Sequence, residues 1–129
     1  MKTVPPLRAA LAAAVLWLVL PVSARAAGPA ETACHDKQTT VAIMDCLNGL
    51  AGQWDKRLNT AYHAVLNASE SPTRKDALIR AERAWLTYRQ ANCGWYGAQE
   101  GTIHEVEEAG CMLDMTRSRA VELEDALKP

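Results

Sequence analysis

The chain contains four cysteines, and their number and position constrain the fold more than any other feature of the sequence. They are Cys34, Cys46, Cys93 and Cys111. An even number of cysteines in a small exported chain is typical of a disulfide framework, here of two bonds. A metal site is the weaker interpretation, because there is no Cys-x-x-Cys pair and His35, His63 and His104 lack paired-ligand spacing.

The N-terminus indicates export. A basic region, MKTVPPLR, precedes the apolar run AALAAAVLWLVLPV, which is shorter than the roughly 20 residues of a membrane span. Because Ala24 and Ala26 fit a signal peptidase site, we predict a signal peptide over residues 1–26 and a mature domain over 27–129. Cys34 lies beyond this site, so no lipid anchor is expected and the protein is predicted to be periplasmic or secreted. A transmembrane anchor is the alternative.

The mature chain is acidic, and one segment holds the excess. Removal of residues 1–26 leaves 11 basic against 15 acidic residues, which argues against nucleic acid or an anionic membrane as partner. The segment 94–110, between the last two cysteines, contains four glutamates and no lysine or arginine. Its candidate partner-binding residues are Trp95, Tyr96, Glu100, His104, Glu105, Glu107 and Glu108. The alternative is that its aromatics cap the fold and its acids are a solvated surface.

Apolar residues recur in steps of three and four, which predicts helices and leaves no strand pattern in the mature chain. The first helix is expected from about residue 39 to 67. The second follows the N-cap Ser71 and ends near Gly94 or Gly97, and the third covers about 111 to 127. The expected buried stripe of the second helix is Leu78, Ala81, Trp85 and Tyr88.

The segment 94–110 is expected to be largely a loop. Thr102 and Glu105 have capping-box spacing, so a short extra helix is allowed there, with its end at Gly110.

Three helices with short connections predict an all-α fold, a small antiparallel three-helix bundle. This topology places Cys46, Cys93 and Cys111 at one pole, which Cys34 can also reach, so two disulfides would crosslink that pole. Three pairings remain possible. We favour Cys34–Cys46 and Cys93–Cys111, because each closes a short segment. A loop of the second size contributes about 3 kcal/mol.

Several motifs follow one another in a characteristic order from Cys34 to Leu123. Besides the four cysteines, they are D-K-R-L-N-x-x-Y at 55–62, A-x-x-A-W-L-x-Y-R-Q-A-x-C at 81–93 and C-x-x-x-x-T-x-x-R-A-x-x-L at 111–123. This order resembles the LprI-type lysozyme inhibitors, a family of small exported helical proteins. The resemblance implies a non-catalytic protein that binds and inhibits lysozyme. The family takes its name from a lipoprotein, and membrane anchoring is not implied for this chain.

We interpret the motif side chains as parts of the core and of helix packing. Arg89 and Arg119 are expected to pair with acids such as Asp55 or Glu82, because guanidinium groups suit buried ion pairs. The residues assigned to this structural role are Asp55, Leu58, Asn59, Tyr62, Trp85, Tyr88, Arg89, Thr116 and Arg119.

No arrangement of residues points to catalysis, a cofactor or a metal. The serines of the mature chain lack a base within reach by sequence pattern, and no phosphate-binding glycine loop is present. The sequence therefore predicts an exported non-enzyme that binds a protein partner, lysozyme by resemblance, through the acidic segment 94–110. An envelope-stress or assembly module that binds another periplasmic protein is the alternative, and a metal carrier using His104 is a third. The sequence does not fix the oligomeric state.

Overall fold

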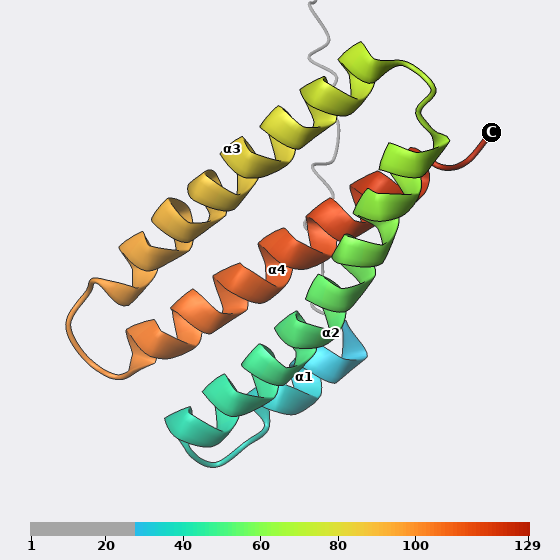
Figure 1. Cartoon of the computed structure of the whole chain (residues 1–129). Helices are drawn as coiled ribbons and strands as arrows, with labels where there is room; N and C mark the ends of the chain where they lie inside the picture. The colour runs from blue at the N-terminus through green and yellow to red at the C-terminus, as the bar shows by residue number, and fades with distance from the viewer. Residues whose placement is uncertain (1–27) are drawn as a thin grey trace, which may run out of the picture.

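The computed structural model describes residues 28–129, and its regular elements over that range are all α-helices (Figure 1). They are α1 (Pro29–His35), α2 (Thr40–Ala68), α3 (Pro72–Gly97) and α4 (Ile103–Asp125). The all-α prediction is confirmed for residues 28–129, which form four helices where the sequence predicted three, because α1 precedes the first helix that was expected. The predicted signal peptide lies outside the described residues. None of the described helices is long and apolar enough to cross a membrane.

The helix boundaries follow local sequence signals. At the start of α2, the Thr39 side chain accepts a hydrogen bond of 3.1 Å from the backbone N–H of Ala42. At the start of α3, Ser71 accepts one of 3.4 Å from Arg74 N–H, with Pro72 in the first turn, as predicted. Before α4, Gly101 has a φ of 97°, a conformation that glycine adopts without strain.

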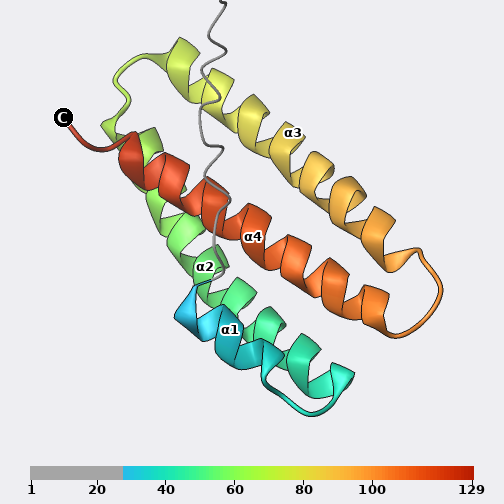
Figure 2. The ribbon, with the colours of Figure 1, turned by 180° about the vertical axis from the view of Figure 1, so that it is seen from behind.

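The helix α4 is the centre of the fold. It packs extensively against α2 and also against α3, whereas α2 and α3 make at most sparse contact with each other. Figure 2 shows α4 between these two helices, with the short α1 against α2. The molecule is therefore more open than a bundle in which three helices pack mutually, and the backbone of α3 lies mainly against α4.

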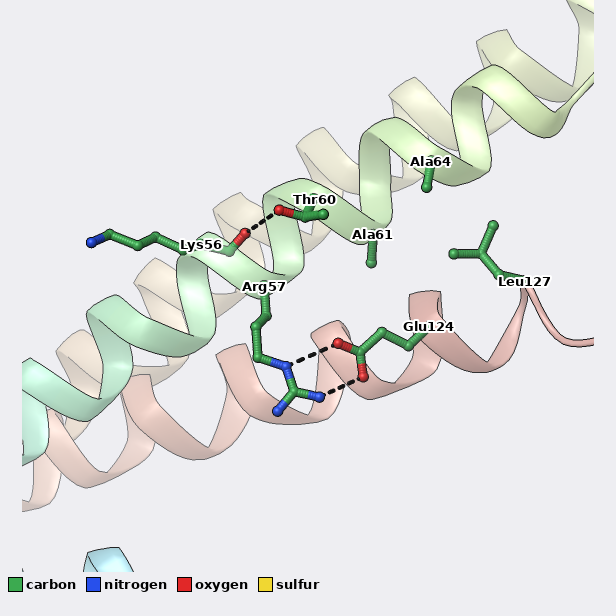
Figure 3. Close-up of a pocket in the computed structure, with 7 residues that line it drawn as sticks. All are labelled: Lys56, Arg57, Thr60, Ala61, Ala64, Glu124 and Leu127. Atoms are coloured by element: carbon green, nitrogen blue, oxygen red, sulfur yellow. Dashed lines mark hydrogen bonds and ion pairs between the residues drawn. The ribbon is translucent and has the colours of Figure 1, made fainter.

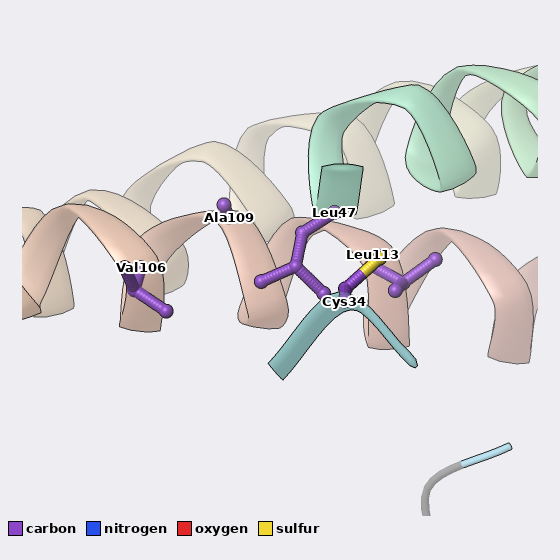
Figure 4. Close-up of a cluster of buried hydrophobic side chains, with 5 residues drawn as sticks. All are labelled: Cys34, Leu47, Val106, Ala109 and Leu113. Carbon is purple, nitrogen blue, oxygen red and sulfur yellow. The ribbon is translucent and has the colours of Figure 1, made fainter. Parts of the chain in front are cut away.

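Two clusters of buried apolar side chains form the core between α2 and α4. The first consists of Cys34, Leu47, Val106, Ala109 and Leu113 (Figure 4). The second consists of Leu58, Ala61, Ala120 and Leu123. Trp54 packs against both. In contrast, the fully buried residues of α3 are Glu82 and Cys93 alone, and its apolar contact with the second cluster comes from the partly buried Leu78 and Trp85.

The two disulfides are the pairs that the sequence favoured. Cys34 is bonded to Cys46 and Cys93 to Cys111, each with a Cα–Cα distance of 5.5 Å. The first links α1 to α2. The second joins the last turns of α3 to α4, so it crosslinks two packed helices rather than closing a flexible loop.

Candidate functional site

The acidic segment forms the tip of a helical hairpin made by α3 and α4. Residues 94–97 end α3, residues 98–102 make the turn, and residues 103–110 are the first turns of α4. The prediction that 94–110 is largely a loop is therefore wrong, although the helix allowed after Thr102 is present and continues as α4. Gly110 lies inside α4 rather than at a helix end, and Thr102 makes no side-chain cap. We call residues 94–110 the hairpin tip. Because helices fix side-chain directions, its acids point in set directions.

The hairpin tip exposes large apolar side chains. Trp95 is 64% exposed and Ile103 is 53% exposed. The rings of Trp95 and Tyr96 meet edge to face with their centroids 4.9 Å apart. The sequence did not single out Ile103. Its only signal was an isolated aliphatic residue at the end of a polar turn.

A groove of about 580 Å³ runs between α3 and α4 below the tip. Its lining includes Asn92, Tyr96, Ile103, Glu107, Asp114 and Met115, with His35 of α1 also contributing. The amide nitrogen of Asn92 lies 3.5 Å from both Cys111 Sγ and Met115 Sδ. We call this feature the α3–α4 groove. Its walls are mainly apolar, and its carboxylates belong to Glu107 and Asp114.

The four glutamates of the tip do not share one surface. Glu107 lines the α3–α4 groove and its Oε2 lies 2.9 Å from His104 Nδ1. Glu105 and Glu108 instead line a cavity of about 420 Å³ beside α2. Glu100 is exposed in the turn. The structure thus brings Glu107 together with Tyr96 and Ile103, and separates it from Glu105 and Glu108.

On the other side of the tip, the Glu108 side chain of α4 lies close to Gly97 of α3. A Cβ atom at position 97 would overlap the Glu108 carboxylate, so any larger residue there would require that side chain to move. Over residues 28–129, no group of three His, Cys, Asp or Glu side chains is placed to hold a metal ion.

A second polar feature, which we call the polar layer, joins α3 to α4. The Nε and Nη2 atoms of Arg119 both lie 2.9 Å from Glu82 Oε2, and both side chains are almost fully buried. Burial lowers the pKa of Arg119, but hydrogen bonds to Glu122 and Glu82 raise it, and the net shift is upward. This guanidinium therefore stays charged.

Arg89 extends the polar layer to α2. Its Nη1 donates a hydrogen bond of 2.9 Å to Thr116 Oγ1 and lies 3.7 Å from Asp55 Oδ1. The two pairings expected for the arginines, with Asp55 and with Glu82, are both present. Asn59 donates to the Asp55 carbonyl and carboxylate at 2.8 Å and 3.0 Å, so it acts within α2.

The aromatic motif residues have different environments. Leu58 is buried, and Tyr62 and Trp85 pack partly buried against the second cluster. The Arg89 guanidinium lies 4.8 Å from the Trp85 ring centroid. Tyr88, however, is 60% exposed and Ala81 is also exposed, so the prediction that these two face the core is wrong. Leu78 and Trp85 of the predicted stripe do pack on the second cluster, and the core-facing side of α3 follows Leu78, Glu82, Trp85, Arg89 and Cys93.

Another cavity, of about 310 Å³, lies between α2 and the end of α4. Arg57 forms two hydrogen bonds with Glu124 there, of 3.0 Å and 2.8 Å (Figure 3). None of the residues proposed to bind a partner lines it.

The chain is similar to known proteins over the range that contains its cysteines, the polar layer and the hairpin tip. The family model described as lysozyme inhibitor LprI matches residues 31–123. The chain belongs to this family. The matched range contains both disulfides, the polar layer and the hairpin tip of this family member. An uncharacterized protein from Rhizobium meliloti (strain 1021) is 27% identical, over 95% of this chain and 97% of its own length. No solved structure matches the chain.

Proposed function

We propose that the protein is an exported, non-catalytic inhibitor that binds lysozyme through the hairpin tip. Membership of a family described as lysozyme inhibitors supports the choice of partner. Two disulfides within residues 28–129 fit an extracellular or periplasmic location. The signal peptide over residues 1–26 and the role of each tip residue stay predictions.

The observation that carries the proposed surface is the exposure of Trp95 next to other apolar side chains. Its ring contacts Tyr96, which lines the α3–α4 groove together with the exposed Ile103. Grouped exposed apolar side chains with an aromatic anchor are typical of a protein contact. The disulfide between Cys93 and Cys111 holds the hairpin that presents these side chains. A surface that is already ordered loses less conformational entropy on association, so this arrangement favours tight binding.

The charge of the hairpin tip supports a basic partner. Its glutamates have no lysine or arginine among the neighbouring tip residues. Many lysozymes are strongly basic, and opposite charge accelerates encounter and favours correct orientation. The α3–α4 groove then offers apolar walls and the Glu107 carboxylate to a basic side chain of the partner.

A cell-wall lysis assay tests the proposal. Protein recovered from the periplasm is incubated with several lysozymes, and we expect lysis by at least one basic lysozyme to slow. Trp95→Ala should weaken the effect. The matched control is Leu86→Ala, which removes an exposed apolar side chain of α3 outside the tip and should inhibit like the parent.

Two outcomes contradict the proposal in different ways. If no lysozyme is slowed, lysozyme is not the partner, and a module that binds another periplasmic protein becomes the better interpretation. If Trp95→Ala inhibits as well as the parent, lysozyme is the partner but the hairpin tip is not the inhibitory surface.

A further inference from the structure

A stripe of apolar residues runs along a face of α3 that none of the described helices covers. It consists of Ala77, Ala81, Ala84, Tyr88, Ala91 and Trp95, all exposed. We call it the α3 stripe. Tyr88 and Trp95 are the two most exposed large hydrophobic residues in the described chain. At 100° per residue, the side chains of this stripe point about a third of a turn away from the core-facing side chains of α3.

The spacing of the α3 stripe is that of a helix–helix seam. Its members are separated alternately by four and three residues, which is the heptad pattern of packed helix pairs. Exposed alanines alone are ordinary, because alanine favours helices. Two aromatic side chains seven residues apart on the same stripe, each mostly open to solvent, are not explained by helix propensity.

We propose that the α3 stripe pairs with the α3 stripe of a second copy of this chain, in antiparallel orientation about a two-fold axis near Tyr88. Such a symmetric contact uses one self-complementary surface twice. With the axis there, Trp95 of each copy lies over Ala81 of the other, and Ala84 lies opposite Ala91. The two Tyr88 side chains meet at the axis, whereas each Trp95 meets a small side chain, Ala81, which permits close packing there.

The charge distribution along α3 selects the antiparallel orientation. The first half of the helix exposes three arginines against one acid, Asp76, so it is basic on balance. The arginines are Arg74, Arg80 and Arg83. The opposite end leads into the turn of the hairpin tip, where Glu100 is exposed, and residues 94–110 contain no lysine or arginine. An antiparallel pair places the basic half of one copy beside the acidic tip of the other, whereas a parallel pair would place like charges together.

This self-association goes beyond the proposed inhibition of lysozyme, and the two share Trp95. Pairing covers the indole that the proposed lysozyme contact needs, so the pair and the lysozyme complex compete. The tests of pairing therefore change Ala84, Tyr88 and Ala91, which lie outside the hairpin tip.

Sedimentation velocity on the protein recovered from the periplasm, from micromolar to millimolar concentration, measures the pairing. We expect the mass of two copies at the upper end, with a dissociation constant that rises as salt screens the charges. Tyr88→Glu places two carboxylates face to face at the axis and should raise that constant by at least roughly tenfold. Gln90→Glu adds the same charge to an exposed position of α3 off the stripe and should leave it unchanged.

The register has its own test. Under mild oxidation, a mixture of Ala84→Cys and Ala91→Cys proteins should form cross-linked pairs faster than either protein alone. Circular dichroism checks that the variants fold, and Ala84→Glu replaces Tyr88→Glu if the latter does not. Because pairing hides Trp95, Tyr88→Glu should inhibit lysozyme at least as well as the parent if the proposed function holds.

Three results would overturn the inference. The parent could sediment as a single copy throughout the concentration range. Tyr88→Glu, or Ala84→Glu in its place, could pair as tightly as Gln90→Glu. Ala84→Cys alone could cross-link faster than the mixture, which would indicate a parallel pair. None of these results depends on lysozyme, so they leave the proposed function unaffected.

Discussion

Arg119 on α4 and Glu82 on α3 form an enclosed ion pair, with two nitrogens of the guanidinium 2.9 Å from the same carboxylate oxygen. Their side chains are only 10% and 9% exposed. Besides the partly buried Leu78 and Trp85, which pack on the second cluster, this pair and the Cys93–Cys111 disulfide attach α3 to α4. The attachment of α3 therefore depends on a few specific contacts, and single substitutions in them should lower the free energy of unfolding strongly.

We expect Arg119→Ala to lower the free energy of unfolding by roughly 3–5 kcal/mol, because Glu82 is left buried without its countercharge. Replacing both residues by leucine should cost much less, since no unpaired charge remains. Urea denaturation of the parent, the single variant and the double leucine variant measures the difference in the free energy of unfolding. Arg57→Ala is the matched control. Its pair with Glu124 is more exposed, so we expect a loss of at most about 1 kcal/mol. Equal losses for the two arginines would contradict the enclosed pair.

The second prediction concerns the disulfides, both of which should be present in protein exported to the periplasm. Replacing Cys93 and Cys111 by serine should lower the free energy of unfolding by about 3 kcal/mol. It should also raise amide hydrogen exchange along the second half of α3, because Cys93 is the only fully buried residue in that half of the helix. Replacing Cys34 and Cys46 should instead loosen α1. Four free thiols by mass spectrometry, or equal exchange in α3 for both variants, would contradict this.

The third prediction separates two aromatic residues of α3 that lie three positions apart. Trp85→Ala removes a partly buried ring that packs on the second cluster and contacts Arg89, so we expect a loss of about 2–3 kcal/mol, below that of a fully buried tryptophan. Tyr88→Ala should change the free energy of unfolding of the single copy by less than about 0.5 kcal/mol. Urea denaturation at dilute concentration compares them. A larger loss for Tyr88→Ala would place Tyr88 in the core.

The parts of the fold that follow from local sequence were predictable. The bounds of α2 and the start of α3 came from apolar spacing and from the Ser71–Pro72 pair, and the structure has both within one residue. The helix α1 was missed because seven residues are too few to show a period, although Pro29 is a helix-start signal. Both Gly97 and Gly110 were interpreted as helix ends, and α3 does end at Gly97, whereas α4 continues through Gly110. In the structure, Gly97 admits the Glu108 side chain and Gly110 is tolerated within α4.

The face of α3 that packs on the core was not predictable from spacing alone. Both the core-facing side and the α3 stripe have steps of three and four, and the aromatic pair Trp85 and Tyr88 divides between them. Contacts distant in sequence, from Glu82 to Arg119 and from Cys93 to Cys111, decide which side is buried. Likewise, the glutamates were grouped because they are neighbours in sequence, although successive helical residues turn by 100° and point apart.

The final prediction uses that separation to locate the inhibitory surface. Glu107 faces the α3–α4 groove with Tyr96 and Ile103, whereas Glu105 and Glu108 face the α2 side. We therefore expect Glu107→Gln to weaken lysozyme inhibition by roughly threefold to tenfold and to reduce its salt dependence. The Glu105→Gln/Glu108→Gln double variant removes more charge from the other face, and we expect a smaller effect from it.

Inhibition constants at low and at moderate ionic strength distinguish the possible outcomes. If the double variant weakens inhibition more than Glu107→Gln does, general acidity attracts the partner and the α3–α4 groove has no special part. Glutamine at all three positions should keep the fold while lowering inhibition, because the three carboxylates stabilise no buried pair in the described chain. If that triple variant matches the parent at low ionic strength, the acidic hairpin tip is not the surface that binds lysozyme.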